Sequence, residues 1–142
     1  NGKFRYNCSI IDLYDRSAVA SLNSDCINTD LAINTLKTAL KKEKHPKVIL
    51  HSDQGVQFTS CEFVNFCKDN NITQSMSKAG CPYDNAPVER FYNTFKSNFY
   101  NVTSFSNVEV MDELTTKYIN WYNYVRPHSH NNYLTPMEAR YK

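Results

Sequence analysis

The chain has 142 residues, of which 41% are hydrophobic and 21% charged, and its formal net charge is +2. This length and balance fit one globular domain with a real core and exclude an intrinsically disordered chain. No apolar run approaches the roughly 20 residues that a membrane-spanning helix needs, and no secretory signal opens the chain. The net charge is too small to indicate nucleic-acid binding by itself.

The cysteines indicate a reducing compartment. Their number is odd, their spacing is irregular and no Cys-x-x-Cys pair occurs, so the sequence suggests neither a disulfide framework nor a zinc site. We expect reduced thiols that pack as small hydrophobic groups in a cytoplasmic protein with no membrane partner. The five residues are Cys8, Cys26, Cys61, Cys67 and Cys81.

The first elements are predicted to form a hairpin. Residues 4–13 alternate in polarity before becoming continuously apolar, which is typical of a half-buried to buried strand. Residues 14–17 are predicted to form a turn, and residues 18–22 a strand that returns antiparallel to the first.

A helix is predicted next. Asn28 or Thr29 can cap it, and it should end before Pro46. Basic residues gather toward its end, where both a solvated helix face and a DNA contact fit the pattern; the solvated face is the favoured interpretation. They are Lys37, Lys41, Lys42, Lys44 and Lys47.

The middle of the chain alternates between strands and helices. Residues 48–51 predict a short buried strand that ends close to Asp53. Thr59 and Glu62 have the spacing of a capping box, followed by apolar residues on one helical face. Residues 72–76 predict another short strand, and residues 77–83 a loop.

Two further helices complete the pattern. Asp84 or Asn85 is predicted to cap the first, with Pro87 in its first turn. Ser106 and Glu109 have capping-box spacing ahead of the second helix. The order of elements fits an α/β sheet flanked by helices. The apolar face of the first of these helices consists of Phe91, Phe95 and Phe99.

Two acids stand out as candidate metal ligands. Asp53 follows a predicted strand, and ligands in open α/β sheets gather outside the carboxyl ends of strands. Gly55 would let the backbone approach a ligand. Glu89 follows after 35 intervening residues. Two separated carboxylates can hold divalent metals against phosphate oxygens; alternatively, both are solvated charges, or Asp53 caps the turn at Gln54 and Gly55.

A polar stripe is predicted around Glu89. Asn93 and Lys96 follow at intervals that place all three side chains on one helical face. Lys96 fits an ordinary exposed lysine as well as a ligand contact. His51 precedes Asp53 by two residues, so in a strand both share a face. His51 could donate to a phosphate or pack beside the strand, and the sequence leaves both open.

Taken together, three ordered blocks of residues resemble the retroviral-integrase-like DDE transposases of bacterial insertion sequences, of the type encoded by a second reading frame (OrfB). The resemblance covers nearly the whole chain. The blocks are His51–Ser60, then Asp84–Ala86 with Glu89 and Lys96, and then Trp121–Asn123 with Arg126–His128 and Leu134–Pro136.

The resemblance implies a ribonuclease-H-like (retroviral integrase) α/β fold, a mixed sheet flanked by helices with the first strand absent. It implies that Asp53 and Glu89 are catalytic acids that bind Mg²⁺ or Mn²⁺, and that Lys96 contacts a DNA end. We add His51, Gln57 and Asn93 to the expected DNA-binding residues. DNA, as transposon ends and target, and further copies of the chain are the implied partners; no small-molecule cofactor is expected.

The family carries a first catalytic Asp on a strand that precedes the hairpin, and residues 1–142 contain no such strand. Asp12 and Asp15 are poor replacements, because the start of the first strand, near Phe4, should lie closest to the metals. Asp12 is eight residues further on, about 25 Å at about 3.3 Å per residue. We therefore expect an N-terminally truncated catalytic core domain that is inactive alone.

The leading prediction is a transposase core that cleaves DNA and transfers strands in a metal-dependent reaction. A ribonuclease-H-like nuclease is a second candidate, against which the block at Trp121–Pro136 argues. A non-catalytic DNA-binding or assembly module is the third. His128 and His130 are assigned a structural role rather than zinc binding. Core positions are expected for Trp121, Tyr122 and Tyr124.

Overall fold

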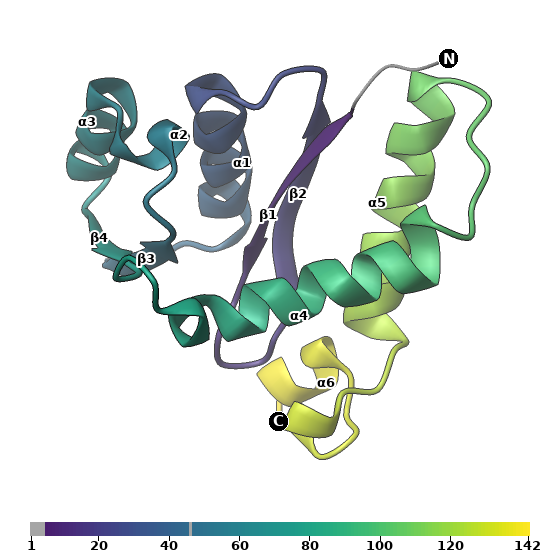
Figure 1. Ribbon diagram of the computed structural model, residues 1–142. Coiled ribbons are helices and arrows are strands. Elements are labelled where there is room, and N and C mark those ends of the chain that lie inside the picture. The colour runs from purple at the N-terminus through teal and green to yellow at the C-terminus, as the bar shows by residue number, and fades with distance from the viewer. Residues whose placement is uncertain (1–4, 46) are drawn as a thin grey trace. The chain divides into compact units, whose positions relative to one another are not determined.

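The computed structural model describes residues 5–45 and 47–142 (Figure 1). The chain divides into two compact units. The first comprises Asn1–Cys8 and Leu22–Ala86, and the second comprises Ser9–Ser21 and Pro87–Lys142. No helix in the described part of the chain has the length and apolar character to cross a membrane.

The predicted hairpin is present. Strands β1 (Tyr6–Ile11) and β2 (Ala18–Ser24) form a two-stranded sheet. Asn7 bonds to Asn23 and Ser9 to Ser21, each at 2.9 Å. From the first bonded pair to the second, the residue number rises by two on β1 and falls by two on β2, so the strands are antiparallel. Phe4, the predicted start of the first strand, lies outside the described residues, as does Pro46.

Helix α1 (Thr29–Lys42) begins where the sequence predicts. The side chain of Asn28, rather than that of Thr29, caps it by accepting a hydrogen bond from Leu31 N at 3.0 Å. Glu43 follows as the C-cap. The buried face of the helix consists of Leu31, Ala32, Thr35, Leu36 and Ala39.

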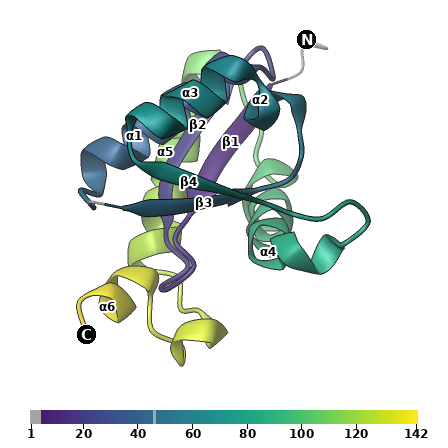
Figure 2. The ribbon, with the colours of Figure 1, turned by 90° about the vertical axis from the view of Figure 1, so that its left-hand side faces the viewer.

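Strands β3 (Val48–Ser52) and β4 (Ile72–Met76) pair in parallel, with His51 opposite Ser75. Within the described residues, the strands expected to make up a mixed sheet form two two-stranded sheets, β1 with β2 and β3 with β4. The prediction that β3 is buried is wrong: its residues are half-buried or exposed, and Ile49 is 75% exposed. The helices of this unit lie on one side of the pair (Figure 2), whereas a continuous apolar parallel strand is normally covered on both faces.

Helix α3 starts one residue later than the predicted capping box. Its N-cap is Ser60, whose hydroxyl accepts from Phe63 N at 3.3 Å. Thr59 cannot serve as that cap, because it is the last residue of the preceding short helix. The predicted apolar face is confirmed by the burial of Phe63 and Cys67. The two helices are α2 (Val56–Thr59) and α3 (Cys61–Asp69).

The second unit is built around aromatic rings. Phe91 and Tyr122 have ring centroids 5.2 Å apart, and those of Phe95 and Phe99 lie 5.3 and 5.1 Å from the ring of Tyr118. The predicted aromatic face is thus confirmed as core. The helical elements of this unit are α4 (Ala86–Phe95), which continues into a π-helical segment (Lys96–Tyr100), α5 (Val108–Tyr124), a 3₁₀ turn (Ser129–Asn131) and α6 (Pro136–Arg140).

Helix α5 corrects two predictions. Asn107, not Ser106, is its N-cap and accepts from Val110 N at 2.8 Å. Tyr122 is buried as expected, but Trp121 is 40% exposed and Tyr124 63% exposed. Each residue along a helix turns the side chain by about 100°, so when Tyr122 is buried Trp121 points about 100° and Tyr124 about 200° away from it.

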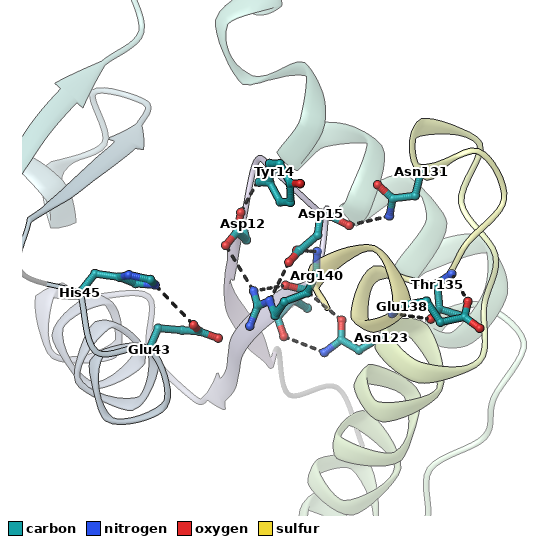
Figure 3. Close-up of polar contacts among 12 residues, drawn as sticks. Asp12, Tyr14, Asp15, Glu43, His45, Asn123, Asn131, Thr135, Glu138 and Arg140 are labelled. Carbon is teal, nitrogen blue, oxygen red and sulfur yellow. Dashed lines mark hydrogen bonds and ion pairs between the residues drawn. The ribbon is translucent and has the colours of Figure 1, made fainter. Parts of the chain in front are cut away.

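The end of the chain packs on the hairpin turn (Figure 3). Arg140 donates from Nε to Asp15 at 2.7 Å and from its terminal nitrogen to Asp12 at 3.2 Å. Asn131 donates to the backbone carbonyl of Asp15 at 2.7 Å. Both aspartates that were rejected as the first catalytic acid are therefore engaged by Arg140.

Candidate metal and DNA site

Asp53 lies just beyond the carboxyl end of β3, with its side chain exposed. Its Oδ1 accepts a hydrogen bond from Gly55 N at 2.8 Å. This is the turn-capping contact that the sequence left open as an alternative. It uses one carboxylate oxygen, and no described contact engages the other. Turn capping and metal binding are therefore compatible at this residue.

Gly55 brings a second oxygen to the same place. A Cβ at position 55 would stand 2.9 Å from Asp53 Oδ1 and 2.9 Å from Gln57 Oε1. Both oxygens thus face the point that a side chain at 55 would fill. A carboxylate and an amide oxygen are hard donors of the kind that Mg²⁺ and Mn²⁺ prefer. The donor set in the first unit fits a divalent metal.

The loops that follow β3 and β4 are tied together next to Asp53. Gln54 donates from Nε2 to the carbonyl of Ser77 at 2.9 Å, and Ser77 N donates to the carbonyl of Ser52 at 2.9 Å. Because the two strands are parallel, both loops leave the same edge of the sheet. These bonds hold the backbone that carries Asp53.

His51 is part of a half-buried network of hydroxyl groups. Its Nδ1 lies 2.8 Å from Ser75 Oγ and its Nε2 lies 3.1 Å from Ser77 Oγ. Asn85 also donates to Ser77 Oγ, at 2.5 Å. With both ring nitrogens paired, the geometry favours packing beside the strand. A phosphate contact from His51 would have to replace one of these bonds.

The segment before α4 differs from the prediction. Asp84 accepts from Lys78 N at 3.2 Å, and Asn85 bonds to Ser77, so these bonds replace the capping role that was predicted for one of the two side chains. A 3₁₀ turn (Pro82–Asn85) leads directly into the helix, and Ala86 N donates to the carbonyl of Tyr83. The turn thus provides a backbone partner for the amide at the start of the helix, as a capping side chain would.

Glu89, Asn93 and Lys96 are exposed on α4 and on the start of its π-helical continuation, while Phe91 and Phe95 are buried. The polar stripe and the aromatic face are therefore separate, as predicted. Lys96 opens the π-helical segment, whose backbone closes with a bond from Asn101 N to Lys96 O at 2.8 Å. Such segments are frequent at functional sites.

The two predicted acids belong to different units: Asp53 to the first and Glu89 to the second. Within residues 5–45 and 47–142, no group of three or more His, Cys, Asp or Glu side chains is arranged to hold a metal. The candidate ligands are thus Asp53 with Gln57 in one unit and Glu89 in the other.

The histidines near the C-terminus make local contacts. His128 is buried, its ring packs edge-on against Tyr122 with centroids 4.5 Å apart, and its Nε2 lies 3.2 Å from the carbonyl of Tyr122. Burial lowers the pKa of His128 below its ordinary value. His130 Nε2 lies 3.3 Å from the carbonyl of Tyr14. These contacts favour the structural role over zinc binding.

Comparison with known proteins gives matches along nearly the whole chain. One family model described as an integrase core domain matches residues 1–82, and a second with the same description matches residues 70–136. Transposase InsK of insertion sequence element IS150 from Escherichia coli is 36% identical over 141 residues, covering 99% of this chain and 50% of that protein. Transposase InsF of IS3A from Escherichia coli is 34% identical over 139 residues, covering 96% and 48%.

Solved structures show the same fold. The simian T-cell lymphotropic virus intasome in complex with PP2A regulatory subunit B56 gamma gives a TM-score of 0.75 at 17% identity, covering 96% of this chain and 48% of that one. The HTLV-2 integrase catalytic core domain in complex with magnesium (dimeric form) gives 0.59 at 17% identity, covering 93% and 81%.

The chain spans about half the length of the curated transposases that it matches. Its fold is that of the retroviral integrase catalytic cores, the ribonuclease-H-like fold that the sequence predicts. The chain belongs to the integrase core domain family.

Proposed function

We propose that this chain is part of the catalytic core of a bacterial insertion-sequence DDE transposase, which cleaves transposon-end DNA and joins it to target DNA. The observation that carries this proposal is the setting of Asp53. Its carboxylate is exposed at the carboxyl end of β3, beside a glycine at which a side chain would collide with Asp53 and Gln57. The 36% identity to an insertion-sequence transposase along 99% of the chain supports the same reaction.

Asp53 and Glu89 are the proposed metal-binding acids, with Gln57 contributing an amide oxygen beside Asp53. A bound Mg²⁺ or Mn²⁺ would stabilise negative charge on the oxygens of the reacting phosphodiester. Gly55 keeps the approach to Asp53 open. Asn93 and Lys96, exposed on the same helical face as Glu89, are proposed to contact DNA phosphates.

His51 has an indirect role in this proposal. Its ring nitrogens bond to Ser75 and Ser77, and Ser77 also accepts from Asn85. We propose that this network positions the loop that begins at Asp53 with respect to the loop after β4. His51 is thus a positioning residue whose predicted DNA contact would be secondary.

The family resemblance calls for a third carboxylate. Asp12 and Asp15 are both bonded to Arg140, so neither is proposed for that role. A longer polypeptide with the upstream strand would supply the third acid. The solved neighbours include integrase cores in dimeric and trimeric forms, and we propose that the complete transposase also acts as an oligomer on DNA in the bacterial cytoplasm.

The test is Mn²⁺-dependent strand transfer on a labelled transposon-end duplex, with an extended protein that adds the strand expected to carry the third acid. Asp53→Asn should reduce product formation at least about 100-fold, because a metal ligand is lost. Asp69→Asn removes an equal charge from an exposed position at the end of α3 and should leave activity unchanged. An extended protein that binds DNA but joins nothing would favour the assembly module instead.

A further inference from the structure

Positive charge is concentrated in one short segment, residues 37–47, here called the basic segment. It contains five lysines and one glutamate, a formal charge of +4. Since the whole chain carries +2, the remaining residues together carry −2. The lysines are Lys37 in α1, Lys41 and Lys42 in its last turn, and Lys44 and Lys47 between α1 and β3.

The five lysines are exposed, and none takes part in an ion pair or side-chain hydrogen bond with another described residue. The ammonium group of Lys37 lies 5.7 Å from the centre of the Phe66 ring, which fixes its direction without neutralising it. Glu43 has His45 as a partner at 3.6 Å (Figure 3). The positive charge of the segment is thus available to a partner.

Helix stability explains only part of this charge. Lys41 and Lys42 complement the negative end of the α1 dipole. Lys37 and Lys41, however, are four residues apart on the helix, where like charges repel. Lys44 and Lys47 lie beyond the helix. Lys44 and Lys47 therefore gain nothing from the helix dipole, and the contact that Lys37 makes is with the Phe66 ring rather than with a negative charge.

The basic segment leads directly into the strand that carries the candidate site. β3 starts at Val48 and ends one residue before Asp53. Asp53 follows Lys47 by six positions along the chain, or about 20 Å at about 3.3 Å per residue. That is about six base pairs of B-form DNA at about 3.4 Å per pair. A duplex of about six base pairs or more that contacts Asp53 therefore spans the distance to Lys47.

We propose that the basic segment binds the phosphate backbone of duplex DNA outside the metal site, without regard to sequence. The proposal rests on the proposed function, which brings DNA to Asp53. Lysine ammonium groups act as point charges for phosphate. Protein partners usually require large apolar side chains as anchors. The exposed large hydrophobic residues of the described chain include none between positions 37 and 47.

The test measures binding of this chain to a fluorescent 20-base-pair duplex by anisotropy, in EDTA and at several salt concentrations. Lys44→Gln/Lys47→Gln should lower affinity about tenfold or more at 0.1 M salt, and should reduce the slope of log K against log salt by about two. Lys117→Gln/Lys142→Gln removes the same charge elsewhere and should change neither quantity to this extent. All four lysines are exposed, so folding should be retained, as circular dichroism would verify.

Equal affinity and slope for the two double variants would overturn the proposal. The same would follow if Lys44→Gln/Lys47→Gln lost binding to poly-glutamate but kept binding to DNA, since the partner would then be an acidic polypeptide. Asp53→Asn separates this test from that of the proposed function. It should bind duplex normally in EDTA, yet fail in strand transfer in the extended protein. If strand transfer depends on Asp53 while the lysine variants bind normally, only the basic-segment proposal is wrong.

Discussion

Arg140 donates from its Nε to Asp15 Oδ2 at 2.7 Å, a contact between residues 125 positions apart in the sequence. The Asp15 side chain is 1% exposed and that of Arg140 17%. The same guanidinium reaches Asp12 and the hydroxyl of Ser17. The last helix of the chain thus neutralises a buried carboxylate in the turn between β1 and β2, within the second unit.

Arg140→Ala should strongly destabilise the chain. It would leave the Asp15 carboxylate buried without a counter-ion, a change that typically costs about 3–5 kcal/mol. Urea unfolding followed by circular dichroism would measure the free energy of unfolding. Lys117→Ala is the matched control, because Lys117 and Glu113 form an exposed pair at 3.1 Å whose loss should matter by less than about 0.5 kcal/mol. Similar effects for the two variants would contradict the assigned role of Arg140.

Gly55→Ala should impair activity while leaving stability nearly unchanged. A Cβ at this position would approach both Asp53 Oδ1 and Gln57 Oε1 to 2.9 Å, so the carboxylate must move. The φ angle of −58° suits alanine, so the backbone is not strained. We expect at least about a tenfold loss of strand transfer in the extended protein, since small displacements of reacting groups have large effects.

Gly80→Ala is the control for that experiment. Gly80 has a φ of +75°, where a side chain is strained, but a Cβ there would meet nothing within 4 Å. It should lower stability by about 1 kcal/mol and leave strand transfer intact. If Gly55→Ala retained full strand transfer, the proposed geometry of Asp53 would be wrong.

The local elements of this fold could be predicted from the sequence, because hydrophobic periodicity and turn residues determine the structure of the few residues around them. The hairpin, α1, the β3–β4 strands and the aromatic face of α4 all occur where the pattern predicts them. Capping was less accurate. Asn107 and Ser60 each cap one position later than predicted, because two adjacent polar residues can each accept from the amide three residues further on and the sequence does not decide between them.

Contacts between residues that are far apart in the sequence could not be predicted. Nothing near Arg140 in the sequence indicates Asp15, and nothing near His51 indicates Ser77, because each pair is brought together only by folding. Asn123 is a further case: it pairs through its amide with both backbone groups of Ala18. The resemblance identified Asp53 and Glu89 as the acids and the sequence allowed Asp53 to cap the turn at Gly55, but the amide oxygen of Gln57 on the same side of Gly55 required the structure.

His128 should make stability depend on pH. Burial lowers its pKa in the folded chain below the ordinary value of 6.5, so the unfolded chain binds the proton more tightly. The stabilisation is present above about pH 6.5 and is lost as the pH falls from there toward the lowered pKa. Urea unfolding at pH 7.5 and 5.5 should show a larger decrease in unfolding free energy for the wild type than for His128→Gln. An equal decrease would contradict the assignment.

Tyr118→Phe should stabilise the chain or leave it unchanged. The hydroxyl of Tyr118 is buried with no hydrogen-bond partner among the described residues, and burial raises its pKa to about 12. Removing an unpaired buried hydroxyl relieves a desolvation cost of about 1 kcal/mol while keeping the ring that packs on Phe95 and Phe99.

Tyr92→Phe is the opposite case, because the hydroxyl of Tyr92 accepts a hydrogen bond from Ser9 N at 3.0 Å. This substitution removes the hydrogen bond between Ser9 N and the Tyr92 hydroxyl and should destabilise by about 1 kcal/mol. Thermal and urea unfolding of the two variants should therefore move in different directions. A loss of stability in Tyr118→Phe as large as that in Tyr92→Phe would show that the Tyr118 hydroxyl has a partner, such as a buried water, within the aromatic core.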